Sequence, residues 1–377
     1  HGQRLSESVG LVECLETVRR ESQWDRKRAE YARQTSTEKR RGIGVAALFH
    51  GSSLGAEGED YAGSTIEIWP DYTIGVTSGL TDYGTGSRTV FTLIAAEELG
   101  VKPARVKILR PDTDTALESG PTVASRSTIL GGGAVQLVAR NLANLLNLAA
   151  ANLLKCEVGQ LMRVDERYVG PSEEPVPWEV VVDHAKAMGL ILSAQGKWTA
   201  PNIHWDAQAG HGTPYFVYHY AAQVAEVEVD LRTGKTEVIG FWAAHDLGKT
   251  IFPQGAYGQL YGGVAQGLGY ALFEEINYVD GYLQSVNFDE YLIPTAVDVP
   301  EIKGFLIEKS FSGGPYGAKN IAEPTMVPTA PAIVNAIAHA TGRRVRDLPA
   351  NLEQVLLGYK LHPKASASMC KLGLKTM

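Results

Sequence analysis

The chain has 377 residues, 44% hydrophobic and 20% charged, which is typical of a globular protein long enough for two domains or one domain of two lobes. A formal net charge of -7 argues against a nucleic-acid-binding surface. The sequence contains no run of about 18 apolar residues, so it predicts no membrane-spanning helix. Cys14, Cys156 and Cys370 lie far apart without CxxC spacing, which predicts neither a disulfide framework nor an iron–sulfur cluster and favours a cytoplasmic location. Because the chain begins at His1 rather than Met, we expect a processed chain or a piece of a longer one.

Local patterns in the first half predict alternating helices and strands. Residues 1–41 predict charged helices, and 64–69 with 72–77 predict a β-hairpin. A helix carrying Phe91, Ala95 and Leu99 follows and stops at Gly100, and residues 106–110 predict a strand. The last element is a long helix with one apolar stripe, formed by Val135, Val138, Leu142, Leu145 and Ala149.

Two loops that precede these helices carry groups suited to binding. Loop 78–87 (SGLTDYGTGS) brings glycines and backbone N–H groups to a helix N-terminus, which is a common anion site. Loop 121–128 (PTVASRST) offers the hydroxyls of Thr122, Ser125 and Ser127. Turn formation and helix capping explain the same residues without a ligand, so both interpretations stay open.

The second half opens with an irregular, polar region over 157–201 that we interpret as an insertion with one helix starting at Trp178. Residues 215–230 and 236–244 then predict a hairpin, the clearest strand signal in the chain. The helix that follows contains many glycines, each of which costs about 1 kcal/mol relative to alanine. We therefore expect something large to pack against its backbone, and we expect residues after 358 to form a peripheral tail.

Loop 313–324 (GGPYGAKNIAEP) ends in one carboxylate, Glu323, just before the apolar helix-like run 331–340. Its glycines permit close backbone approaches, and Pro324 favours an extended conformation in the residue before it. An acid on a stiff loop of small residues suits proton transfer. The alternative is that Glu323 caps the following helix, where a carboxylate favours the positive end of the dipole.

Other ligand and catalytic motifs fail on spacing. The triplet Gly248-Lys249-Thr250 lacks the leading glycine of a phosphate-binding loop, because that position is Ala243. His204, His211 and His219 are not at a usual metal-ligand spacing, so we interpret them as surface or packing side chains. No HExxH motif is present.

Four segments, taken in order, resemble the C-terminal half of the molybdenum-binding subunit of the xanthine dehydrogenase and aldehyde oxidase family. They are 78–87, 121–128, 258–269 and 317–324, and the stretches 291–294 and 330–342 also match that family's pattern. The resemblance covers residues 42–342 in collinear order.

The resemblance implies an α+β fold with two lobes of mixed sheet and packed helices that meet over a pterin. The expected division is a charged helical segment over 1–41, a first lobe over 42–215 with the insertion 157–201, a second lobe over 216–358 that carries Glu323, and a tail over 359–377.

The resemblance also implies a molybdenum hydroxylase, which transfers a water-derived oxygen to an aldehyde or N-heteroaromatic carbon. The expected cofactor is molybdopterin with molybdenum, as plain pterin or as its cytosine dinucleotide, with no metal ligand from this chain. Expected partners carry the N-terminal half of the molybdenum subunit, iron–sulfur clusters and FAD, and the substrate is a small molecule. Alternatives are a family member that reduces an aromatic acyl-CoA, a catalytically silent scaffold, and a plain sugar- or nucleotide-binding module.

Site residues follow from the resemblance position by position. Glu323 matches the base and Gln259 a glutamine beside the molybdenum centre. The remaining matches are Gly84, Thr85 and Gly86 for a GQG cofactor loop, Thr122, Ser125 and Ser127 for a hydroxyl-bearing cofactor loop, and Ala124, Leu54 and Gly55 for the substrate pocket. Thr85 replaces the family's glutamine, and Leu54 replaces an aromatic residue of xanthine-oxidising members, which argues against purine stacking.

Overall fold

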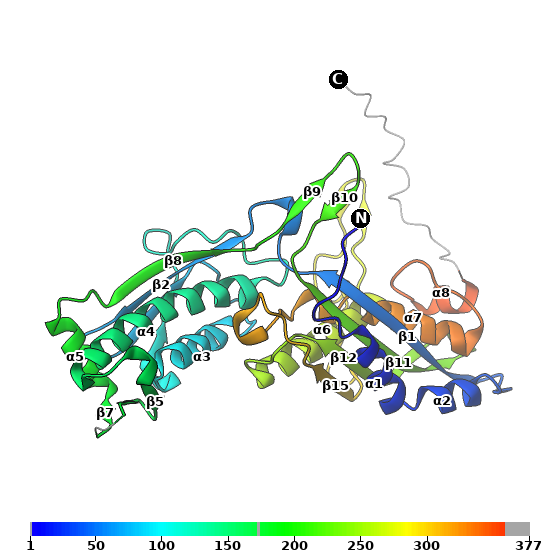
Figure 1. The fold of residues 1–377 in the computed structure, drawn as a ribbon. Coiled ribbons are helices and arrows are strands. Elements are labelled where there is room, and N and C mark those ends of the chain that lie inside the picture. The colour runs from blue at the N-terminus through cyan, green and yellow to red at the C-terminus, as the bar shows by residue number, and fades with distance from the viewer. Residues whose placement is uncertain (1, 172–173, 359–377) are drawn as a thin grey trace.

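The chain folds into two lobes, each a four-stranded sheet with packed helices, at the two ends of an elongated molecule (Figure 1). The structure is a computed structural model and describes residues 2–171 and 174–358. One sheet has the order β4 (Val106–Ile108), β3 (Ile74–Ser78), β2 (Tyr61–Ile68) and β8 (Ser193–Thr199). The other has the order β1 (Lys39–Gly51), β11 (Tyr218–Asp230), β12 (Thr236–Asp246) and β15 (Ile302–Ile307). The predicted α+β class is confirmed.

The β2 lobe is built around one long apolar helix. Its helices are α3 (Ser87–Leu99), α4 (Gly132–Leu154) and α5 (Trp178–Ala187). Four of the five stripe residues predicted for α4 are buried in the core shared with the sheet and with Phe91 of α3, and Leu145 is half-buried against that core. The lobe also contains a π-helical turn η3 (Ser127–Gly131), short 3-10 turns at η1 (Gly55–Glu57), η2 (Pro103–Arg105) and η4 (Val158–Gln160), and a small sheet of β5 (Met162–Val164), β6 (Arg167–Val169) and β7 (Val176–Pro177).

The β11 lobe is a sheet covered on both faces. Side chains that alternate along β11 and β12 pack either on α6 (Pro253–Leu272) and α7 (Thr329–Thr341) or on α1 (Leu11–Glu21) and α2 (Trp24–Tyr31). Gly42 and Gly44 of β1 let α7 lie directly on the strand, since a Cβ at either position would overlap the α7 backbone. The remaining elements are α8 (Leu352–Leu357), the 3-10 turns η5 (Pro315–Gly317) and η6 (Glu323–Thr325), and the hairpins β9 (His204–Asp206) with β10 (His211–Thr213) and β13 (Tyr278–Val279) with β14 (Tyr282–Leu283).

The elements with strong local signals are confirmed. β2 and β3 pair antiparallel around the predicted turn, and β11 and β12 form the predicted hairpin. Helix α3 ends at Gly100, whose φ of +69° is the left-handed conformation of a helix C-terminus. None of the helices within the described ranges is both long and apolar enough to cross a membrane.

Two predicted boundaries differ from the structure. β1, expected to open the first lobe, pairs with β11 along its whole length and therefore belongs to the second lobe's sheet. The supposed insertion 157–201 is part of the first lobe, because α5 buries Trp178 in its core and β8 pairs with β2. Strand β8 is exposed or half-buried along most of its length, which explains its weak apolar pattern. The predicted tail 359–377 lies outside the described residues.

Candidate functional site

Two adjoining hollows lie where the lobes meet, and all four segments picked out in the sequence contribute residues to their linings. The hydroxyl hollow is lined by side chains that include Thr85, Ser87, Thr122, Ser125, Ser127 and Asn320. The glutamine hollow is lined by Gln259 of α6, together with Thr85, Thr128, Phe252, Lys319 and Ile321. Thr85, Thr128 and Ile321 line both, so the two hollows are neighbours.

The hollows are small. Their volumes are about 40 and 50 Å³, against roughly 300 Å³ or more for an enclosed small-molecule site. These residues of the chain therefore form a wall of a site and do not enclose a pocket of cofactor size.

The loop before α3 is organised by its own carboxylate. Asp82 accepts hydrogen bonds from the backbone N–H groups of Gly84 at 2.9 Å, Gly86 at 3.2 Å and Arg88 at 3.0 Å. Burial would raise the pKa of Asp82, but these N–H donors outweigh it and hold the pKa below its usual value. The N–H groups of Gly84 and Gly86, which we expected to face an external anion, are therefore occupied. Positive φ angles of +113° and +79° explain why both positions are glycine.

The loop 121–128 is wound around a buried guanidinium. Arg126 pairs with Asp60, with 3.1 Å between Nε and Oδ1, and donates to the carbonyls of Ser119 and Pro121. Ala124 and Ser125 adopt positive φ angles of 54° and 48°, which non-glycine residues rarely do. Backbone strain of this kind persists only where surrounding contacts impose it, and the buried ion pair supplies them here.

The predicted substrate-pocket residues lie next to one another. The carbonyl of Ala124 accepts a hydrogen bond of 2.8 Å from the N–H of Ser53, which places segment 53–55 beside the loop 121–128. Gly55 has a φ of +60°, and a Cβ there would overlap the Tyr215 ring. Gly55 is thus required by packing, and the half-buried Leu54 supplies the side chain on this segment.

Glu323 opens the turn η6, and its side chain is exposed. Its backbone N–H donates to Ser125 Oγ at 3.1 Å, which connects the two loops directly. The carboxylate makes no hydrogen bond or ion pair within residues 2–171 and 174–358, although it is close enough to His50 of β1 to oppose the burial that lowers the pKa of that ring. Neither η6 nor α7 has a side-chain cap, so the alternative in which Glu323 caps a helix finds no support.

Several buried polar atoms at this wall lack a partner. Ser87 Oγ and Asn320 Nδ2 are buried, line the hydroxyl hollow and make no hydrogen bond to any part of the chain that the structure describes. A buried polar atom without a partner costs about 1–3 kcal/mol. Two such atoms at one hollow, beside the hydroxyls of Ser125 and Ser127, fit a polar ligand with several hydrogen-bonding atoms.

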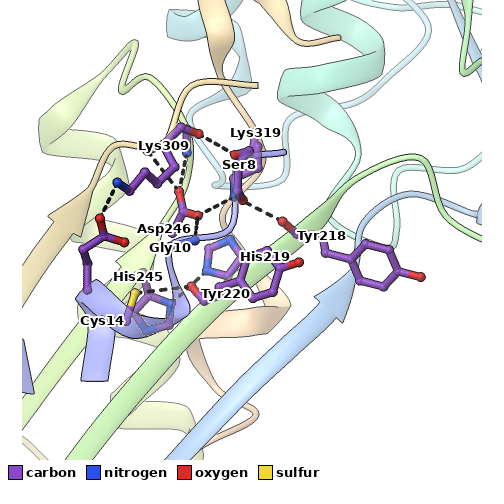
Figure 2. Close-up of polar contacts among 12 residues, drawn as sticks. Ser8, Gly10, Cys14, Tyr218, His219, Tyr220, His245, Asp246, Lys309 and Lys319 are labelled. Atoms are coloured by element: carbon purple, nitrogen blue, oxygen red, sulfur yellow. Dashed lines mark hydrogen bonds and ion pairs between the residues drawn. The ribbon is translucent and has the colours of Figure 1, made fainter. Parts of the chain in front are cut away.

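The Glu323 segment rests on a buried ion pair. Lys319 Nζ lies 2.7 Å from Asp246 Oδ2 and donates to the carbonyls of Ser8 and Tyr218 at 3.1 Å each (Figure 2). Asp246 also accepts the N–H of Gly10 at 2.9 Å, so the N-terminal segment closes over this pair.

Sequence reasoning missed the residues that organise the site, namely Asp82, Ser87, Arg126, Lys319 and Asn320. Arg126 and Lys319 carried a usable signal, because each is a charge within a run of small residues next to a predicted site loop. Asp82 two residues before Gly84 was a signal for an Asx turn. Ser87 and Asn320 carried no such sequence signal, because their role is inferred from side-chain atoms that are buried without a hydrogen-bond partner in the structure.

Comparison with known proteins identifies relatives of the chain. Residues 17–300 match the family model described as molybdopterin cofactor-binding domain. The chain is 30% identical over 345 residues to the xanthine dehydrogenase molybdenum-binding subunit of Escherichia coli O157:H7 (91% of this chain, 45% of that protein). It is 31% identical over 358 residues to the aldehyde oxidoreductase of Megalodesulfovibrio gigas (94% of this chain, 36% of that protein).

Solved structures share the fold. The quinoline 2-oxidoreductase of Pseudomonas putida 86 superposes with a TM-score of 0.81 at 25% identity, covering 94% of this chain and 46% of that one. The chain thus spans less than half the length of each of these relatives. The match over 17–300, together with identities of 30% and 31% across most of the chain, shows that it belongs to the molybdopterin cofactor-binding domain family of xanthine dehydrogenases and aldehyde oxidoreductases and corresponds to the C-terminal part of their large subunits.

Proposed function

We propose that this chain forms one wall of the molybdenum–pterin site of a hydroxylase and that Glu323 is the base of the reaction. The observation that carries the proposal is the unpartnered carboxylate of Glu323 on a segment bonded to Ser125, beside the hollow that also contains the unpaired Ser87 and Asn320. The expected chemistry is oxygen transfer from water to an aldehyde or N-heteroaromatic carbon.

The residues of the wall fit a pterin by the chemistry of their donors and acceptors. Gln259 and Thr85 would face the group from the glutamine hollow, and Thr122, Ser125 and Ser127 from the hydroxyl hollow. Thr122 Oγ1 and Ser125 Oγ already accept backbone N–H groups, so each keeps its own proton to donate. We add Ser87 and Asn320 to this set because both have unused hydrogen-bonding capacity. Gly84 and Gly86 would contribute through the shape of their loop.

The bound group supplies the oxidation chemistry and makes a water-derived oxygen acidic enough for a carboxylate to take its proton. A Glu323 Oε atom accepts that proton. Because the carboxylate has no competing partner in the described chain, it is available for this transfer. Leu54 and Ala124 would border the substrate, and Leu54 offers no flat ring on which a purine could stack.

The site needs a second chain or segment to complete it. The hollows do not enclose a cofactor, and the chain covers under half of its relatives. Gly258 and Gly262 of α6 face open space, while Tyr261 and Tyr270 of the same helix are 41% and 52% exposed. We propose that the N-terminal half of the molybdenum subunit covers this face and that iron–sulfur and FAD subunits carry the electrons away. Tyrosine is enriched at protein–protein interfaces.

We also propose a cytoplasmic location, because Cys14 and Cys156 are free thiols. The following experiment separates the hydroxylase from the rival scaffold function, and a substrate screen separates it from the rival reductive function.

The test compares Glu323→Gln with Glu301→Gln in the purified complex. Glutamine keeps the shape of Glu323 but cannot accept the proton, so turnover should fall by about 10²–10⁴-fold with molybdenum and pterin content unchanged. Glu301 is exposed, and its variant should match the wild type. Wild-type turnover of Glu323→Gln would reject the base, and a complex without molybdenum or pterin would support the scaffold instead.

A further inference from the structure

Three buried side chains on adjacent strands form a continuous chain of hydrogen bonds under the Glu323 segment. His219 and Gln223 lie on β11 and His245 on β12, and all three are 0% exposed. His219 Nε2 is 3.0 Å from His245 Nδ1, and His245 Nε2 is 3.0 Å from Gln223 Nε2. The contact of the two rings is visible in Figure 2.

The two ends of this chain are backbone carbonyls on either side of Glu323. His219 Nδ1 lies 2.8 Å from the carbonyl oxygen of Asn320, and Gln223 Nε2 lies 2.7 Å from that of Thr325. The segment 320–325 is therefore held at both ends by side chains of the sheet beneath it.

The partners determine where each proton lies. A carbonyl only accepts, so His219 Nδ1 must carry a hydrogen. The neutral ring then accepts at Nε2, which requires His245 Nδ1 to donate, and His245 Nε2 accepts from the Gln223 amide. The second amide hydrogen of Gln223 binds the Thr325 carbonyl, and its Oε1 accepts the Thr329 hydroxyl at 2.7 Å. This arrangement satisfies every polar side-chain atom of the three residues, with both rings neutral and protonated at Nδ1.

The surroundings favour neutral rings. Burial, followed by the neighbouring His245 and Lys319, holds the pKa of His219 well below its usual value. The charged and titratable groups around it are His50 from β1, His245 and Asp246 from β12, and Lys319 from the loop before Glu323. Burial also lowers the pKa of His245. A proton added to either ring would remove an acceptor and break the chain.

We propose that His219, His245 and Gln223 are positioning residues that hold the backbone on both sides of Glu323 and thereby place its carboxylate. The inference rests on the proposed role of Glu323 as the base. Because the carboxylate itself makes no hydrogen bond or ion pair in the described chain, its location is set by the segment 320–325. The bonds that hold this segment from below come from the buried chain, and the bond from Ser125 holds it from the side.

The first test determines which nitrogen atoms of His219 and His245 carry a proton, and it requires no measurement of enzyme activity. Nitrogen-15 NMR of histidine-labelled protein in its complex distinguishes Nδ1–H, Nε2–H and doubly protonated rings. Among the nine histidines, we expect two that are neutral and Nδ1-protonated and stay neutral when the pH falls below about 6.5, the usual histidine pKa. His245→Asn should remove one of these signals and shift the other. Nε2–H or doubly protonated rings at these positions would overturn the proposal even if every variant failed to fold.

The second test measures turnover per bound molybdenum for His245→Leu and His245→Asn, with the exposed His204→Leu as control. Asparagine keeps an N–H donor on the atom bonded to Cγ, whereas leucine removes it. We expect His245→Leu to lower kcat by roughly 10- to 100-fold with a smaller change in KM, as misplacement of a reacting group does, and His245→Asn to recover part of the loss.

The two proposals fail differently. Wild-type kcat in His245→Leu, together with an inactive Glu323→Gln, would overturn the positioning role and leave the base intact. An active Glu323→Gln would reject the base itself, whatever the histidine variants do. Equal kcat in His245→Leu and His245→Asn would also overturn the positioning role, since only asparagine can donate to His219.

Discussion

Replacing Lys319 by methionine should destabilise the β11 lobe by about 3 kcal/mol. The side chains of Lys319 and Asp246 are both 0% exposed and their charged atoms are 2.7 Å apart. Removing one member of a buried ion pair usually costs about 3–5 kcal/mol, because the other charge stays buried. We expect the lower end, because Asp246 keeps backbone N–H donors from Gly10 at 2.9 Å and Gly248 at 3.2 Å. Methionine matches the length of lysine without its charge.

Lys249→Met is the matched control. Lys249 pairs with Glu308 at 3.2 Å, but their side chains are 58% and 40% exposed, and exposed pairs contribute about 0–1 kcal/mol. The free energy of unfolding is measured by urea titration followed by tryptophan fluorescence, with Trp242 reporting from this lobe. If Lys319→Met lost no more than Lys249→Met, the buried pair would not support the Glu323 segment as described.

Three further outcomes follow from buried groups and close contacts. Gly263→Val should destabilise the chain by about 1–3 kcal/mol, because a side chain at this position would overlap η6. Gly262 faces open space, so Gly262→Ala should stabilise the isolated chain by up to about 1 kcal/mol in the same urea titration. Burial lowers the pKa of His245 to about 3, so the unfolded chain binds a proton below about pH 6.5 that the folded chain refuses. The contribution of His245 to stability should then fall by about 1 kcal/mol for each pH unit as the pH drops from about 6.5 towards 3, and urea titrations of His245→Asn should show a shallower slope. Burial, followed by the nearby charge of Asp246, raises the pKa of Cys14 to about 12. A thiol reagent at pH 8 should therefore label Cys156 in the folded protein and leave Cys14 unreacted, which mass spectrometry of the labelled protein would establish.

Local chemistry made several elements of the fold predictable. The end of α3 at Gly100 and the turn between β11 and β12 depend on neighbours within a few residues. The place of β1 was not predictable in this way, because residues 39–51 pair with residues 218–230. The glycines of α6 show the same limit. Their number predicted close packing, which Gly263 and Gly267 show against Thr325 and Thr329, but composition could not reveal that Gly258 and Gly262 remain open.

The candidate site, like the fold, was predictable from the sequence only in part. Motif order predicted that Glu323, Gln259 and the hydroxyl loop share one wall. In the structure Gln259 and the hydroxyl loop line adjoining hollows and the Glu323 backbone bonds to Ser125, while the roles of these residues stay predictions. The supporting network was missed because its members look unremarkable singly. His219, predicted to be a surface or packing side chain, is fully buried, and it lies beside His245, which the sequence pattern did not single out. His219 and Gln223 are four residues apart, which places both side chains on the same face of a strand. Two polar side chains on one buried face of a strand were the sequence signal for this hydrogen-bonded network.

We propose that a molybdenum centre lies at the wall formed by these loops, with Glu323 facing it. The most direct measurement is an anomalous difference map at the molybdenum edge from crystals of the complex. We predict one peak beside the two hollows, bordered by Gln259 and on the side to which the Glu323 carboxylate points. A peak elsewhere on the chain, or a Glu323 carboxylate turned away from the peak into solvent, would contradict the account.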